Sequence, residues 1–143
     1  MFCLFALVSI SAYSSDLDTY EFAGKHFFAS YLDCDLEALK DADTLIAALD
    51  QAVEASGATI LGSKAHYFSP EAVTVVYLLS ESHASIHTYP EHGACFVDLF
   101  TCGDNCSSEK FDEALRSYLK PKTVEAKLFL RSSQTHEIPL KRT

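Results

Sequence analysis

Between Leu79 and Gly93 the chain carries a high density of side chains that could attack a carbonyl, move a proton or bind a metal ion. A serine beside an acid and a histidine suggests nucleophilic chemistry, whereas several histidines with an acid suggest a metal site. A third interpretation is that these residues form the solvent face of a strand, as polar residues on strands most often do. The reactive members of the segment are Ser80, Glu81, Ser82, His83, Ser85, His87, Glu91 and His92.

The spacing of these side chains weighs against two of the interpretations. If residues 84–88 form a strand, His83 and His87 lie about 13 Å apart, too far to chelate one ion. Pro90 disfavours the helix that would bring them together, so we predict no metal site. The Gly-x-Ser-x-Gly turn of many serine hydrolases does not occur here, which leaves a hydrolytic triad with little support. The segment nevertheless follows the most apolar stretch of the chain, where a buried strand emerges and functional residues often lie.

The elements that must position this segment can be read from the hydrophobic pattern. A helix begins near Asp43, with Asp41 or Asp43 as its N-cap, and Gly57 ends it. A second amphipathic helix contains Phe111 and Leu115 on one face. Apolar, β-branched or alternating segments predict strands at 20–32, 58–68, 72–79, 84–88, 94–101 and 123–130.

This order of elements predicts an α+β fold, a two-layer sandwich in which two helices cover one face of a mainly antiparallel sheet. The other face of the sheet then needs a cover. In a chain of this length a partner subunit is the simplest one, so we expect a homo-oligomer.

Composition excludes several classes of function. The chain has 20 acidic and 11 basic residues and a formal net charge of -9. Proteins that bind nucleic-acid backbones need a basic face, so we expect no nucleic-acid partner. The five cysteines form an odd, scattered set that does not resemble a disulfide framework, which favours a cytoplasmic location.

The two ends of the chain differ from its centre. The first residues, MFCLFALVSISA, are apolar and end in small residues, as a signal peptide does. However, no Lys or Arg precedes the apolar run, and the run is too short to cross a bilayer. We expect no export and no membrane partner. The predicted organisation is an N-terminal extension (1–19) to which we assign no role, one domain (20–131) and a polar tail (132–143).

Several short motifs together resemble one family, the bacterial and archaeal S-adenosylmethionine decarboxylase proenzymes. The resemblance covers about residues 20 to 119. The motifs that carry it are Gly24-Lys25-His26, Cys34-Asp35, Gly57-Ala58-Thr59, Ala65 to Pro70, Glu81-Ser82-His83, Ser85 to Thr88, Pro90-Glu91, Gly93, Val97-Asp98 and Phe100 to Gly103.

The resemblance implies that the chain cuts its own backbone between Glu81 and Ser82. The Ser82 hydroxyl attacks the Glu81 carbonyl, and removal of the Ser82 α-proton then expels the Glu81 carboxylate. Ser82 is converted into a pyruvoyl group, the cofactor that forms a Schiff base with the substrate and stabilises the carbanion left by decarboxylation. His87 matches the family's processing base, and Cys102 matches the family's proton donor.

Three further positions take their roles only from the resemblance. Phe68 matches an aromatic residue that stacks on the substrate adenine, and Glu91 matches an acid that binds the ribose hydroxyls. Thr74 matches a residue that supports self-cleavage. Here Ala72 and Val75 stand where many relatives have glycine, and Tyr89 stands where tryptophan is frequent.

The implied function is decarboxylation of S-adenosylmethionine, which provides the aminopropyl donor for spermidine synthesis, by a dimer of cleaved protomers. Two alternatives stay open. The same pyruvoyl chemistry could act on arginine or ornithine, because pocket changes can alter specificity without touching the reactive residues. A non-catalytic regulatory homologue is the third reading, although it predicts loss of Ser82 or His87, and both are present.

Overall fold

The computed structural model describes residues 22–102 and 105–141, so the predicted extension at 1–19 lies outside the described residues. Strands and helices follow one another in an irregular order. They are β1 (Gly24–Leu32), α1 (Leu36–Lys40), α2 (Ala42–Ala55), β2 (Ile60–Phe68), β3 (Ala72–Leu79), β4 (Ser82–Tyr89), the 3-10 helix η1 (Pro90–His92), β5 (Ala94–Cys102), α3 (Ser108–Leu119), β6 (Thr123–Arg131) and β7 (His136–Glu137).

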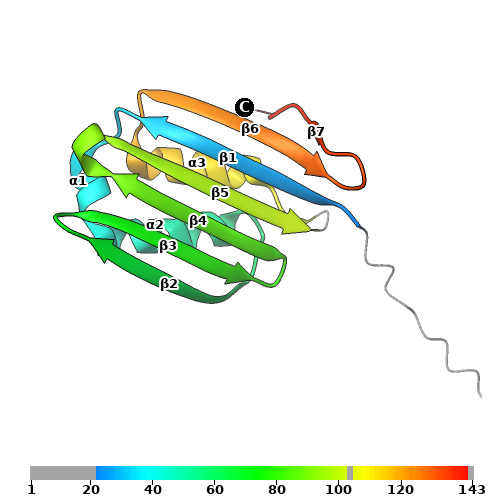
Figure 1. The fold of residues 1–143 in the computed structure, drawn as a ribbon, viewed down its shortest axis with the longest axis horizontal. Helices are drawn as coiled ribbons and strands as arrows, with labels where there is room; N and C mark the ends of the chain where they lie inside the picture. Colours follow the sequence, from blue (N-terminus) through cyan, green and yellow to red (C-terminus); the bar gives the residue numbers. More distant parts are fainter. Residues whose placement is uncertain (1–21, 103–104, 142–143) are drawn as a thin grey trace, which may run out of the picture.

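The strands form one antiparallel sheet in the order β2-β3-β4-β5-β1-β6-β7. The helices lie behind this sheet, all on the same face (Figure 1). The α+β two-layer fold expected from the sequence is therefore confirmed. No described helix has the length and apolarity needed to cross a membrane.

The helices begin where side chains can cap them. Asp41 caps α2 by accepting a hydrogen bond from the Thr44 amide at 3.1 Å, as the sequence predicts. The helix α1 was not expected, because five residues are too few to show a helical period. Its N-cap Asp35 accepts from the amides of Glu37 and Ala38, which is the local signal for this helix.

The core lies between the sheet and the two longer helices. Leu45, Leu49 and Val53 of α2 and Phe111 and Leu115 of α3 are fully buried. The strands contribute every second residue to this layer, since successive side chains of a strand point to opposite faces. On β5 the inward set is Cys95, Val97, Leu99 and Thr101.

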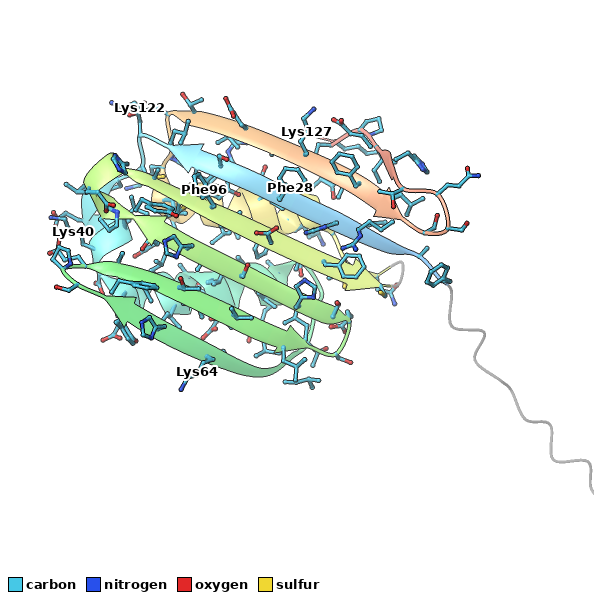
Figure 2. All side chains as sticks on the ribbon, in the orientation of Figure 1. Phe28, Lys40, Lys64, Phe96, Lys122 and Lys127 are labelled. Carbon is cyan, nitrogen blue, oxygen red and sulfur yellow. The ribbon has the colours of Figure 1, made fainter. Side chains whose placement is uncertain are left out.

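The opposite face of the sheet has no covering layer in the described chain. Figure 2 shows Phe28 and Phe96 on this open face. Phe96 is 46% exposed and Leu78 is 61% exposed, although both lie on internal strands of the sheet. Large apolar side chains gathered on one face mark an interaction surface, in agreement with the expected need for a cover.

The C-terminal segment departs from the expectation of a purely polar tail. His136 and Glu137 form β7 beside β6, and Lys127 binds Glu137 at 2.8 Å. Ile138 and Leu140 pack against the core, and the Ile138 amide donates to the Leu128 carbonyl at 2.9 Å. Strand pairing, an ion pair and two apolar residues together dock this segment on the domain.

Candidate active site

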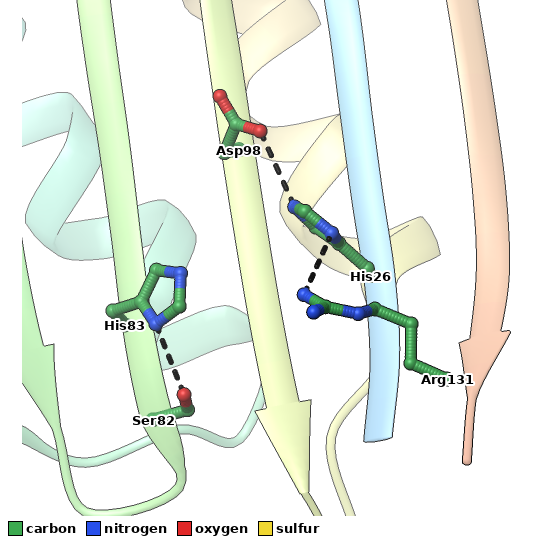
Figure 3. A network of polar contacts seen from close by, with 5 residues as sticks. All are labelled: His26, Ser82, His83, Asp98 and Arg131. Atoms are coloured by element: carbon green, nitrogen blue, oxygen red, sulfur yellow. Dashed lines mark hydrogen bonds and ion pairs between the residues drawn. The ribbon is translucent and has the colours of Figure 1, made fainter. Parts of the chain in front are cut away.

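The predicted cleavage bond lies in a tight turn between β3 and β4. Leu79, the last residue of β3, pairs with Ser82, the first residue of β4, so that only Ser80 and Glu81 connect the strands. The strand was predicted from residue 84 and begins two positions earlier. The Ser82 hydroxyl lies 3.0 Å from His83 Nδ1 (Figure 3).

Two hydrogen bonds hold Glu81 in place. Its carboxylate Oε2 accepts from the backbone amide of Thr59 at 2.8 Å. Its backbone carbonyl, the carbonyl of the predicted cleavage bond, accepts from the amide of Cys102 at 2.9 Å. An N–H group that donates to this oxygen polarises the carbonyl and stabilises negative charge that develops on it during nucleophilic attack.

Cys102 reaches this turn through strand pairing. Ser82 pairs with Thr101 across β4 and β5, which places the following residue beside the Glu81–Ser82 bond. Cys102 is half-buried, and its backbone lies beside the turn at the end of the sheet. A second thiol also lies near Glu81: burial raises the pKa of Cys106, and the negative charge of Glu81 raises it further.

His87 lies near the other end of β4, in a group of aromatic and polar residues. It pairs across the strands with Thr74, whose hydroxyl hydrogen-bonds to His87 Nδ1. The rings of Phe68 and Tyr89 flank the imidazole, with centroids 5.5 Å and 4.4 Å away. We call His66, Phe68, Thr74, His87, Tyr89 and Phe96 the His87 cluster; His66 contacts Phe68, and Phe96 contacts Tyr89.

Glu91 lies beside this cluster, but the structure records no contact between its side chain and the cluster. It belongs to η1, directly after Tyr89, and is exposed, with its carboxylate 4.0 Å from His92 Nε2. The Glu91 carboxylate is therefore accessible to solvent.

The predicted site residues thus fall into two groups within one chain. Glu81, Ser82 and Cys102 meet at the β3–β4 turn, whereas Phe68, Thr74 and His87 meet near the opposite end of the strands. Ser82 and His87 are separated by five steps along one strand, which corresponds to about 16 Å at ~3.3 Å per residue. Within a single chain His87 does not reach Ser82.

A polar network on the open face was not predicted from the sequence. His26 Nε2–H donates to Asp98 Oδ1 at 3.3 Å, and Arg131 Nη1–H donates to His26 Nδ1 at 3.4 Å (Figure 3). The Arg131 guanidinium also lies 4.7 Å from the ring centroid of Phe100. The available signal was the alternation of β5, which directs Asp98 to the open face.

Comparison with known proteins identifies the family of the chain. The family model for S-adenosylmethionine decarboxylase matches residues 25–132. The chain belongs to the S-adenosylmethionine decarboxylase family. Curated relatives of the chain are described as S-adenosylmethionine decarboxylase proenzymes.

Individual relatives cover most of the chain. A proenzyme from Synechococcus sp. (strain WH7803) is 42% identical over 120 residues, which span 84% of this chain and 94% of the relative. One from Thermotoga maritima is 43% identical over 101 residues, 71% of this chain and 78% of the relative. The crystal structure of the adenosylmethionine decarboxylase from Aquifex aeolicus has a TM-score of 0.69 and 30% identity, and the match covers 85% of this chain and 95% of that one.

Proposed function

We propose that this protein decarboxylates S-adenosylmethionine after cutting its own chain between Glu81 and Ser82, and thereby provides the aminopropyl donor for spermidine synthesis. The observation that carries the proposal is the meeting of Glu81, Ser82 and Cys102 at one turn, with the Cys102 amide on the Glu81 carbonyl oxygen. Relatives that carry the proenzyme name support both the activity and the self-processing.

The first step of maturation follows from the turn. The Ser82 oxygen attacks the Glu81 carbonyl carbon, the bond from that carbon to the Ser82 nitrogen breaks, and the hydroxyl proton ends on the nitrogen. The peptide becomes an ester between Glu81 and the Ser82 side chain. The Cys102 amide stabilises the negative charge on the carbonyl oxygen during attack. His83 Nδ1, at 3.0 Å, can accept the hydroxyl proton.

The second step needs a base for the Ser82 α-proton, and we assign it to His87. Its side chain is oriented by the hydrogen bond with Thr74 and by the flanking rings. Because about 16 Å separates the two residues on one strand, the base must come from a second copy of the chain. Loss of the α-proton then breaks the bond between the Ser82 Cβ and the ester oxygen, which releases the Glu81 carboxylate and leaves dehydroalanine at position 82. Water hydrolyses the imine tautomer of this residue, which gives the pyruvoyl group and releases the nitrogen as ammonia.

A dimer formed through the open face satisfies this requirement. If two sheets pack face to face around a two-fold axis near the middle of β4, the Ser82 end of each strand lies opposite the His87 end of the other. Two identical composite sites result. The same contact covers Leu78, Phe96 and the His26–Asp98 pair, which a single chain leaves on an uncovered face.

After maturation Ser82 would provide the pyruvoyl group, which acts as an electron sink for decarboxylation. The surroundings support this role: cleavage would make residue 82 the first residue of the downstream fragment, and Cys102, whose backbone amide contacts Glu81, would serve as the proton donor. From the other copy, Phe68 offers an exposed ring for stacking on adenine, and Glu91 offers a carboxylate for the ribose hydroxyls. Arginine and ornithine lack both of these groups.

The free thiols of the described residues favour a reducing, cytoplasmic compartment. Intact-mass spectrometry of the purified protein tests the maturation: we expect fragments 1–81 and 82–143, the second bearing pyruvoyl in place of the amino-terminal serine. A single uncut chain would refute it. Release of carbon dioxide from S-adenosylmethionine, arginine and ornithine, measured side by side, tests the substrate. Turnover of arginine or ornithine without turnover of S-adenosylmethionine would refute S-adenosylmethionine as the substrate.

A further inference from the structure

The β3–β4 turn has its positive φ angle on Ser82, the residue after the turn, and not on either of its two central residues. Two-residue hairpin turns normally have positive φ at one or both central residues, which matches the right-handed twist of the strands. The described non-glycine residues with positive φ are Asp33, Ser82 and Lys120, so neither Ser80 nor Glu81 has one. The positive value falls instead on Ser82, at 151°.

This conformation is unfavourable for any residue with a Cβ atom. Backbone in this region is occupied almost only by glycine, and other residues adopt it where the surroundings force them to. The strain therefore lies on the residue whose nitrogen belongs to the predicted cleavage bond.

We propose that the Glu81 carboxylate is the positioning group that holds the turn in this strained form. This inference rests on the proposed cleavage at Glu81–Ser82. The carboxylate accepts from the Thr59 amide at 2.8 Å, and the Thr59 carbonyl accepts from the Ser80 amide at 2.9 Å. Because the Cys102 amide also donates to the Glu81 carbonyl, the turn is hydrogen-bonded both to Thr59 and to the end of β5.

The backbone of Thr59, to which the turn is hydrogen-bonded, follows a closely packed segment. Thr59 follows the end of α2, where Gly57 has a φ of 91° and lies so close to Asn105 that an added Cβ would meet the Asn105 carbonyl oxygen at 2.8 Å. The Ser107 amide donates to the Ser56 carbonyl at 2.8 Å in the same region. Thr59 therefore directly follows a segment that is packed against the loop before α3.

The strain acts on the first step of maturation. The torsion φ of Ser82 includes the carbonyl carbon of Glu81, and transfer of that carbon from nitrogen to the Ser82 oxygen removes this torsion. The strain is therefore released when the ester forms, which favours the ester over the peptide. Glu81 acts through geometry, because its carboxylate is bound to Thr59 while the Ser82 hydroxyl contacts His83.

One experiment measures the strain in chains that cannot cut themselves. Ser82→Ala and Ser82→Gly are compared by thermal unfolding of the full chain. At an ordinary strand position glycine is less stable than alanine. We expect the reverse order, a higher melting temperature for Ser82→Gly, because glycine adopts this φ without strain. A lower melting temperature for Ser82→Gly would overturn the proposal, and this result does not depend on whether the natural chain is cut.

A second experiment measures the role of Glu81 in cleavage. Newly synthesised chains are sampled over time, and the uncut fraction is determined by intact mass. We expect Glu81→Ala to slow cleavage about tenfold, equivalent to about 1.4 kcal/mol. Glu81→Gln is expected to cleave near the natural rate, because its side-chain oxygen still accepts from Thr59. Thr59→Ala is the matched control, since it keeps the backbone amide.

The outcomes distinguish failure of the positioning role of Glu81 from failure of the proposed cleavage. If Glu81→Gln is as slow as Glu81→Ala, the carboxylate charge matters and the positioning role is wrong. If Glu81→Gln and Glu81→Ala both cleave at the natural rate, the hydrogen bond to Thr59 does not affect cleavage and the proposal also fails. If the natural chain is not cut between Glu81 and Ser82, the proposed maturation itself is refuted.

Discussion

A mixed dimer tests whether His87 of one chain acts on Ser82 of the other. Neither Ser82→Ala nor His87→Ala is expected to mature alone, because the first lacks the cofactor precursor and the second lacks the base. A mixed dimer of the two restores one complete site, with Ser82 from the His87→Ala chain and His87 from the Ser82→Ala chain. The other site of that dimer lacks both residues.

The expected yield follows from the geometry. A base must come within about 3 Å of the proton it removes, and the distance along β4 is about 16 Å, so cleavage within one chain contributes nothing. Random pairing of equal amounts makes about half of the dimers mixed. About half of the His87→Ala chains should therefore mature, and none of the Ser82→Ala chains.

The assay uses co-expression of the two variants with different affinity tags, so that the dimers form during synthesis. Intact mass then gives the fraction of His87→Ala chains that bear pyruvoyl at residue 82. Pyruvoyl is the appropriate signal, because slow hydrolysis of the ester would leave serine at that position. Absence of pyruvoyl in the mixed sample, with both single variants folded and dimeric, would refute the composite site.

Other predictions follow from single contacts. Cys102→Ala should lower decarboxylation strongly while cleavage persists, because the backbone amide on the Glu81 carbonyl remains; loss of cleavage by intact mass would contradict this. Thr74→Val should slow pyruvoyl formation several-fold and Thr74→Ser should not, because only serine keeps the hydrogen bond to His87; equal rates would count against that bond. Leu78→Glu should weaken the dimer in sedimentation experiments without lowering helix content by circular dichroism, since the side chain is exposed in the single chain; an unchanged dimer would mean that the open face is not the interface. A hydrogen bond from Cys95 lowers the pKa of Cys34 and raises that of Cys95. Alkylation of Cys34 should therefore continue to lower pH than alkylation of a free cysteine, and Cys95→Ala should shift the pH profile of Cys34 alkylation to higher pH. An unshifted profile would contradict the contact between the two thiols.

Much of the local structure could be predicted from the chain alone. The apolar segment 72–79 forms β3 with the expected bounds, and Asp41 caps α2 as its residue type suggests. Helical and strand periods are local properties, and a capping carboxylate acts on amides a few residues away. The short elements α1 and β7 escaped prediction because five and two residues are too few to show a period.

The motifs around Ser82 also identified the family without a structure, because a reactive serine with its neighbours occupies a contiguous segment. The predicted strand at 84–88 already implied that residues along this segment lie far apart, but the segment could not show which residues of other strands lie beside each of its ends. Ser82 and His87 are close in sequence, yet an extended strand separates them by about 16 Å. Cys102 is distant in sequence, yet the pairing of β4 with β5 brings it to the cleavage bond.

The residue types of the Leu79–Gly93 segment therefore indicate its proposed chemistry, whereas the tertiary structure decides which residues of other strands lie beside Glu81 and Ser82. Strand order places Cys102 and Thr59 on either side of Glu81, and His26 beside Asp98. In our proposal the unusual φ of Ser82 likewise depends on hydrogen bonds to Thr59 and Cys102, which are remote in sequence. The physical reason is the same in each case: hydrogen bonds between strands depend on register, and register is set by the packing of the whole sheet.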